Sequence, residues 1–340
     1  MNVNRESSET GRYDMRVNHR DTNPRDWYHH CLTAGATIAD EIIPGKSNFE
    51  VQRNMASIQD IHIIDSNTAT ATPVPSGLKR KLCSPGLCGS DTLTVYRRTV
   101  TPGREFDVEA GDFYHVLYVI NDPVSCFILY GGETHRAGQG AGVLLAPHES
   151  ADVDASGTGV DLLHMVVPTP PAAVEDGLPG GPGYFFNRGT LRVLSDASGG
   201  RIRRFCAESS VRLPDGSRLT PTNAIQAGEM HYVEGGSSPY HSHVGTDANP
   251  DGPAHCYMTF KGRGVVEVEG ETQEIEPGTL VYFPTGVPHR LRALDGPLDY
   301  FEIQAWRSFK TKVLSEEPLG LRWYYEPVHP GADPVEWNQS

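Results

Sequence analysis

Residues 237–264 read SSPYHSHVGTDANPDGPAHCYMTFKGRG and place three histidines, His241, His243 and His255, around a polar loop rich in Gly, Pro, Asn and Asp. Successive side chains of a strand point to opposite faces, so His241 and His243 share one face of the strand that carries them. His255 opens the next apolar run, and His289 follows the turn PTGVPH after a further predicted strand. We expect these four imidazoles to converge inside a small barrel.

A cluster of buried neutral imidazoles leaves its acceptor nitrogens unsatisfied, whereas a divalent transition metal satisfies all of them. The alternative is that one or two are ordinary core or surface histidines. A His-x-His pair alone is weak evidence for a metal site in a chain with 14 histidines. The presence of His255 and His289 nearby makes the pattern more specific. The sequence therefore predicts one divalent metal ion per chain, although imidazole ligands alone do not name the metal.

The pattern on both sides of this stretch is that of an all-β protein. In GVVEVEGETQEIEPGTLVYFP, residues 264–284, apolar and polar residues alternate, and Gly270 marks a reversal typical of a hairpin with one buried face. From Thr92 onward, short apolar runs such as HVLYVI and SCFILY are separated by Gly, Pro, Asp and Asn. This spacing favours a sandwich or barrel over alternating βαβ units.

Composition shifts divide the chain into five parts. Residues 1–90 are predicted to be an extension with one amphipathic helix, beginning near Tyr28, and an arm. A first barrel is predicted at 91–168, a Pro/Gly-rich linker at 169–190, a metal-binding barrel at 191–310, and a tail at 311–340 that packs on it. GDFYHVLYVI followed by GVLLAP parallels GPAHCYMTF followed by GTLVYFP, which indicates an internal duplication.

Charge and composition limit the partners. A net charge of -14 opposes binding to nucleic acid or an anionic membrane, and no run reaches the ~20 apolar residues that span a bilayer. The N-terminus has no apolar signal region, and the six cysteines form neither a CxxC pair nor a dense disulfide framework. We expect a cytoplasmic protein, homodimeric, whose partner is a small molecule.

Residues 235–293 resemble the two motifs of the cupin superfamily. The first motif is matched by Gly235, His241, His243 and Gly262, and the second by Gly278, Pro284, Gly286 and His289. The resemblance implies two jelly-roll barrels. The first barrel lacks His-x-His and a closing histidine, and so resembles a degenerate cupin without metal.

Two positions depart from the family pattern. His255 stands where the first motif has a glutamate, and Ala293 replaces the final asparagine of the second. If His255 is a ligand, four neutral ligands leave the ion its whole divalent charge and favour anionic ligands. All-histidine cupin centres resemble those of ring-cleaving and thiol dioxygenases, which implies Fe(II), with Cu, Ni, Mn or Zn as alternatives.

The leading hypothesis is an oxygenase that uses O2 to oxidise a small anionic substrate, whether aromatic, amino-acid-like or N-hydroxylated. The alternatives are a non-redox isomerase, lyase or decarboxylase, which needs a positioned acid or base, and a binding or storage protein. Tyr257 shares the inward face with His255 and is a candidate catalytic residue. Tyr282 is a second, although Tyr282 and Phe283 alternate and only one can face inward. Glu302 is a further candidate acid or base.

Overall fold

The structure is a computed structural model that describes residues 56–121, 126–155, 157–178, 180–315, 322–326 and 335–337. These residues fall within one compact unit, Arg53–Ser340. The described chain is nearly all β, as predicted, with only short helical turns: η2 (Ile58–Asp60), α2 (Pro85–Cys88) and α3 (Ala172–Glu175). The helix predicted near Tyr28 lies outside the described residues. None of the helices described is long and apolar enough to cross a membrane.

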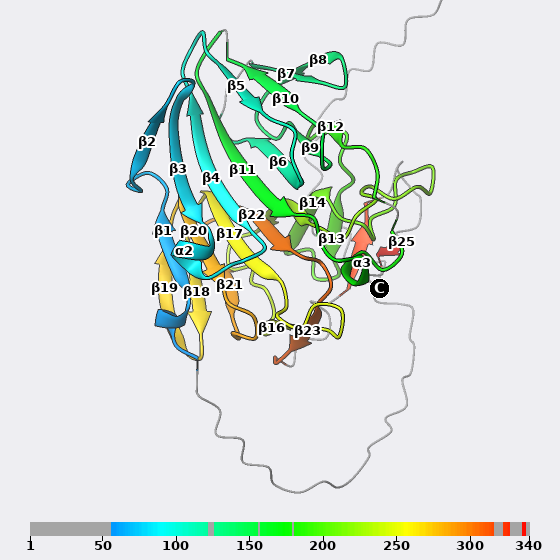
Figure 1. Ribbon diagram of the computed structural model, residues 1–340. Coiled ribbons are helices and arrows are strands. Elements are labelled where there is room, and N and C mark those ends of the chain that lie inside the picture. The colour runs from blue at the N-terminus through cyan, green and yellow to red at the C-terminus, as the bar shows by residue number, and fades with distance from the viewer. Residues whose placement is uncertain are drawn as a thin grey trace, which may run out of the picture. The chain divides into compact units, whose positions relative to one another are not determined.

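Two sheets build the N-terminal barrel (Figure 1). The larger sheet contains, in spatial order, β12 (Tyr184–Phe186), β9 (Gly142–Leu145), β6 (Phe113–Val119), β11 (Val160–Pro168), β4 (Thr94–Val100), β3 (Gly77–Cys83) and β2 (Ala71–Val74). The smaller sheet contains β5 (Glu105–Val108), β10 (Ala151–Asp154), β7 (Cys126–Tyr130) and β8 (Glu133–Ala137).

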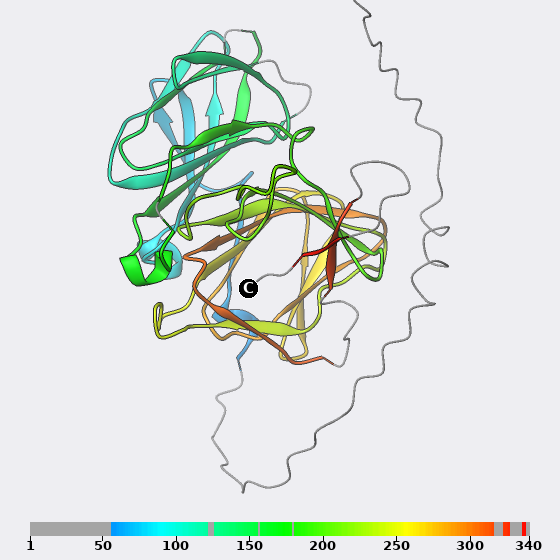
Figure 2. The same ribbon diagram turned by 90° about the vertical axis from the view of Figure 1, so that its right-hand side faces the viewer.

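Three sheets build the C-terminal barrel, whose yellow and orange strands enclose its interior in Figure 2. The largest contains β1 (His62–Asp65), β20 (Thr279–Phe283), β17 (Ala254–Lys261), β22 (Leu298–Ala305), β15 (Gln226–Tyr232), β14 (Arg201–Ala207), β13 (Leu194–Asp196), β24 (Trp323–Tyr325) and β25 (Val335–Trp337). The others are β19 (Glu271–Ile275), β18 (Gly264–Val268) and β21 (Arg290–Ala293), and the pair β16 (His241–Val244) and β23 (Lys310–Val313).

The strand order repeats between the barrels. The order β9-β6-β11-β4-β3 in the first corresponds to β20-β17-β22-β15-β14 in the second. Registers correspond too, since His115 pairs with Val166 in the first barrel and His255 pairs with Gln304 in the second. One edge strand crosses between the barrels. Strand β1 precedes the N-terminal barrel in the sequence but pairs with β20 of the C-terminal barrel.

The period-two alternation of the strands sorts side chains into three layers. On β17, Cys256 and Met258 face a core shared by the two barrels, whereas Tyr257 faces the interior of the C-terminal barrel. A third cluster, including Leu117 and Leu162, fills the N-terminal barrel. Each face of the central strands is thus covered, which explains their long apolar runs.

One disulfide joins Cys83 and Cys88 around α2. The sequence pointed to no CxxC pair or dense framework, and this isolated local bridge was not predicted. The other described cysteines, Cys126, Cys206 and Cys256, are free and buried. Cytoplasmic localisation stays a prediction.

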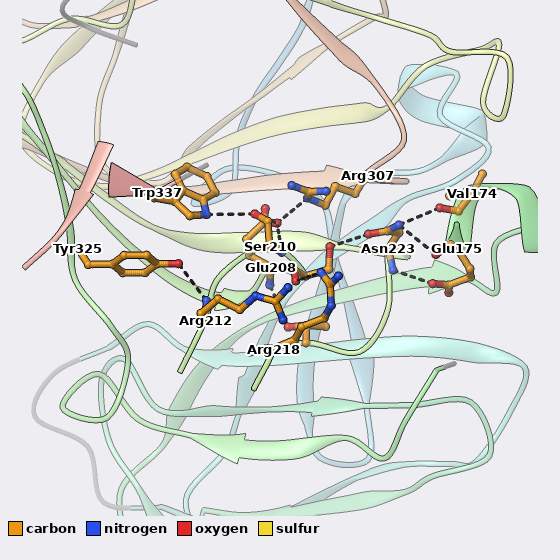
Figure 3. Close-up of polar contacts among 12 residues, drawn as sticks. Val174, Glu175, Glu208, Ser210, Arg212, Arg218, Asn223, Arg307, Tyr325 and Trp337 are labelled. Carbon is orange, nitrogen blue, oxygen red and sulfur yellow. Dashed lines mark hydrogen bonds and ion pairs between the residues drawn. The ribbon is translucent and has the colours of Figure 1, made fainter. Parts of the chain in front are cut away.

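A polar network anchors the linker and the tail to the C-terminal barrel (Figure 3). Arg307 pairs with buried Glu208 at 2.5 Å, and Ser210 of the same loop accepts a hydrogen bond from the Trp337 indole at 3.1 Å. On the linker side, Glu175 of α3 accepts from the Asn223 backbone at 2.8 Å. These contacts tie α3 and β25 to the loop that follows β14.

Candidate metal centre

Three of the four predicted ligands lie on two adjoining segments of the C-terminal barrel. His241 and His243 are on β16, and His289 directly precedes β21. The backbones of His241 and His289 are joined by two hydrogen bonds, of 3.0 and 2.8 Å. On β16, the alternation places His241 and His243 on one face, as the sequence predicted.

The ligand atoms of His241, His243 and His289 all lie within 4.8 Å of one another, and the three residues are buried. In the part of the chain that the structure describes, this is the one such group of His, Cys, Asp or Glu. It contains no carboxylate. A cluster of this composition suits a divalent transition metal.

Each of the three rings is held through Nδ1. The His241 Nδ1 lies 2.7 Å from the carbonyl of Pro239, and the His289 Nδ1 lies 2.9 Å from the carbonyl of Val287. The His243 Nδ1 lies 3.2 Å from Thr311 Oγ1 on β23. Because a carbonyl only accepts, Nδ1 of His241 and His289 carries the proton, and Nε2 keeps its lone pair.

The environment keeps these imidazoles neutral. Burial lowers the pKa of His241 to about 4. Burial, followed by the neighbouring histidines, lowers the pKa of His243 and His289 well below the usual range. Neutral imidazole is the form that binds a metal.

Buried ring nitrogens that lack hydrogen-bond partners are suited to bind a metal ion. His289 Nε2 is buried and has no hydrogen-bond partner among the described residues, and the His243 Nε2 is approached only by the Gln304 amide nitrogen, at 3.3 Å. Unpaired buried polar atoms are costly unless a missing partner satisfies them. The residues present therefore fit a divalent metal, with His241, His243 and His289 as its holders.

The fourth predicted ligand, His255, lies beside this group but is not part of it. Its ring centroid is 4.5 Å from that of His243 and 5.1 Å from that of His289. Its Nε2, however, lies 3.3 Å from Oε1 of Glu302, at ion-pair distance. Both ring nitrogens of His255 are buried without a hydrogen-bond partner among the described residues. His255 as a fourth ligand therefore stays a prediction, and the structure adds a carboxylate of β22 beside it.

Glu302 is buried and charged. Burial by itself raises its pKa, but the charge of Arg203 and the contact with His255 outweigh burial and lower the pKa to about 2. The Arg203 guanidinium lies 3.8 Å from Glu302 Oε2 and 4.1 Å from the ring of Trp323. His255, Glu302 and Arg203 thus form a connected row of ionisable groups next to the three histidines.

Arg203 is a residue of the site that was not predicted from the sequence. In RIRRF, residues 201–205, strand alternation puts Arg201, Arg203 and Phe205 on one face. Phe205 packs in the interior of the C-terminal barrel, so the two arginines point the same way. The shared face of Arg201, Arg203 and Phe205 is the sequence pattern that could have predicted Arg203 in the barrel interior.

The two predicted catalytic tyrosines lie in different parts of the protein. Tyr257 is buried in the barrel interior, with its ring 4.7 Å from that of His255. Tyr282 faces the core between the barrels, near Ser90, and is not brought to the histidines. Phe283 takes the inward position and stacks on His289 at 4.0 Å. The position of Tyr282 thus corrects the expectation that it lines the site.

A cavity of about 70 Å³ adjoins the centre. Its walls include His241 and His243, the row of Arg203 and Glu302, and Trp323 of the tail. A larger cavity of about 320 Å³ lies between the barrels and contains none of the three histidines. The small cavity is the one placed for chemistry at the centre.

Comparison with known proteins agrees with this fold. Residues 228–304 match the family model described as Cupin domain. No curated protein sequence matches the chain. Among solved structures, a protein of Pseudomonas aeruginosa described as glyoxylate induced has a TM-score of 0.60 at 14% identity, covering 80% of this chain and 97% of its own.

Two structures of enzymes are also similar. Oxalate decarboxylase from Bacillus subtilis has a TM-score of 0.55 at 13% identity, with 74% of this chain and 78% of that chain covered. Salicylate 1,2-dioxygenase from Pseudoaminobacter salicylatoxidans has a TM-score of 0.54 at 13% identity, with 75% and 85% covered. The chain therefore contains a cupin domain and has a cupin fold, a fold shared by enzymes of different reaction types.

Proposed function

We propose that this protein is a mononuclear non-haem metal enzyme, with Fe(II) as its metal, that uses O2 to oxidise a small anionic substrate. The observation that carries the proposal is the all-histidine group of His241, His243 and His289 with its inward lone pairs. Neutral ligands leave a divalent ion its full charge and favour anionic partners. Ferrous iron would supply Lewis acidity and the one-electron chemistry that O2 requires.

The residues around the centre support a substrate with a carboxylate. Arg203 presents a guanidinium to the cavity, and guanidinium groups bind carboxylates in two-pronged geometry. Trp323 stacks on Arg203 and holds its plane. Glu302, the present partner of Arg203, is at a loose 3.8 Å, so Arg203 retains donors for a second carboxylate.

Cavity size narrows the substrate class. A cavity of about 150 Å³ is known to hold benzene, and the cavity here is about 70 Å³. An aromatic ring is therefore disfavoured unless the walls move. We favour a compact aliphatic acid, amino-acid-like or N-hydroxylated, within the range expected from the sequence.

A non-redox lyase, isomerase or decarboxylase is a second candidate, and the pair of His255 and Glu302 favours it. A carboxylate 3.3 Å from an imidazole can orient the ring and act with it as an acid–base pair. Such a pair can take a proton from a substrate carbon or oxygen and return it. Tyr257 packs against His255 and lines the same cavity as Glu302.

The deciding experiment compares the protein loaded anaerobically with iron and, separately, with zinc. Each form is given a panel of small aliphatic amino and hydroxy acids, with and without O2. An oxygenase consumes O2 only in the iron form, and nitric oxide changes the electron paramagnetic resonance spectrum of that form. Turnover by the zinc form without O2 would support the non-redox candidate and reject the oxygenase.

A further inference from the structure

A second cluster of chemically active side chains lies in the N-terminal barrel, in a part that the proposed function does not use. Four of its members, Lys79, Lys81, Arg98 and His164, lie against the ring of Tyr96 on β4. The fifth, His115, contacts His164. His164 is buried, and His115 is 9% exposed. We name these five residues the Tyr96 cluster.

Three cations crowd round this one ring. The Nζ atoms of Lys79 and Lys81 lie 5.3 and 6.0 Å from the ring centroid, and Cζ of Arg98 lies 5.3 Å from it. Within the described ranges, none of the three forms an ion pair with a carboxylate. The whole chain carries a net charge of -14, so this local concentration of positive charge is opposite in sign to the chain as a whole.

A directed chain of hydrogen bonds crosses the same cluster. The Arg98 Nε–H donates to His164 Nδ1 at 2.9 Å, and His164 Nε2 lies 3.0 Å from His115 Nδ1. A guanidinium only donates, so Nδ1 of His164 must accept, and its proton sits on Nε2. His164 then donates to His115, which leaves the proton of His115 on its own Nε2.

Burial keeps both rings neutral, in agreement with this direction. It lowers the pKa of His115 to about 4 and that of His164 well below the usual range, and the charge of Arg98 acts in the same sense. The Arg98 guanidinium is fixed in place by the ring of Phe106, whose centroid is 4.1 Å from Cζ. The cluster thus presents cations and N–H donors, with no carboxylate among its five members.

We propose that the Tyr96 cluster binds a small oxyanion, a carboxylate or a phosphate, through Arg98 and the two lysines, while His164 and His115 hold the Arg98 guanidinium in place. Such an anion meets charge-assisted donors and neutralises the crowded cations. The site is separate from the metal centre, although His115 has in its sheet the register position that His255 has in the other. It requires no metal.

The experiment titrates the metal-free full chain at low ionic strength with inorganic phosphate and, separately, with succinate. Binding is followed by calorimetry and by the imidazole nitrogen resonances of His115 and His164. We expect saturable binding of at least one anion, with a shift of the signal of His164 Nδ1, the atom that accepts from Arg98. Lys81→Gln, at an exposed position, and Arg98→Leu are each expected to weaken binding about tenfold.

Arg104→Gln is the matched control, because Arg104 is an exposed cation of the same barrel outside the cluster. It should leave the affinity unchanged. The anion that binds more tightly identifies the ligand as a phosphate or a carboxylate. Absence of saturable binding of both anions, or equal weakening by Arg104→Gln and Lys81→Gln, would overturn the proposal, and neither result would bear on the metal centre.

Discussion

Nε2 of His255 lies 3.3 Å from Oε1 of Glu302, and both side chains are almost wholly buried. His255 is outside the group of three histidines whose ligand atoms lie within 4.8 Å of one another. Its pairing with Glu302 also gives the centre a carboxylate that is close to, but outside, the metal-binding group. The role of His255 is thus tied to Glu302, and Glu302 is tied in turn to Arg203.

Removing Arg203 should be strongly destabilising because it leaves the charge of Glu302 unpaired. Loss of one partner of a buried pair costs roughly 3–5 kcal/mol. Arg203→Met should show such a loss in urea unfolding of the metal-free protein, and Arg203→Met combined with Glu302→Gln should recover much of it. Simple additivity of the two changes would show that the pair is not coupled.

Thr311 should control metal affinity without touching the metal. Its hydroxyl lies 3.2 Å from His243 Nδ1 and, among the described residues, is the one side-chain partner of an Nδ1 atom of the three histidines. Loss of such a partner typically lowers metal affinity 10–100-fold. Thr311→Val should therefore weaken zinc binding by about tenfold or more in a chelator competition, and Thr311→Ser should preserve it. Equal affinities for the two variants would remove Thr311 from this role.

Strand β1 should depend on a glycine of the neighbouring turn. Gly278 has a φ of +98°, and a Cβ there would lie 2.2 Å from Nδ2 of Asn67, two residues after β1. Gly278→Ala combines backbone strain with this clash and should cost ~2–3 kcal/mol in unfolding free energy. Gly270→Ala, with a φ of +85° but open space around the added Cβ, should cost only ~1 kcal/mol. Equal losses would show that Asn67 yields freely.

Acid should destabilise the N-terminal barrel through His115. Burial, with help from the charge of Arg98, lowers its pKa from 6.5 to about 4 in the folded protein. The unfolded state therefore binds more protons between these values, so stability is complete above pH 6.5 and declines as the pH falls towards 4. The contribution is at most roughly 3 kcal/mol.

Urea unfolding of the metal-free protein at a series of pH values checks this. His115→Gln should flatten the decline relative to the unaltered protein, whereas His148→Asn, an exposed position, should leave it unchanged. An identical pH dependence in the unaltered protein and His115→Gln would show that His115 does not titrate in this window.

Strand periodicity was sufficient to predict the all-β fold and the shared face of His241 and His243, because both follow from local alternation. It could not distinguish Tyr282 from Phe283, since alternation fixes that they oppose each other but not which one faces the centre. The partner of His255 was also beyond reach. Its pairing with Glu302 depends on β17 and β22 lying side by side, a contact between residues 47 positions apart that no local pattern contains.

Metal content tests the assignment of the three-histidine centre most directly. It is measured after anaerobic loading with iron and removal of excess metal, for the unaltered chain, His289→Ala and His255→Ala. We expect close to one iron per chain in the unaltered protein, loss of iron in His289→Ala and retention of iron in His255→Ala. Loss of iron in His255→Ala with retention in His289→Ala would contradict the assignment of the three-histidine centre.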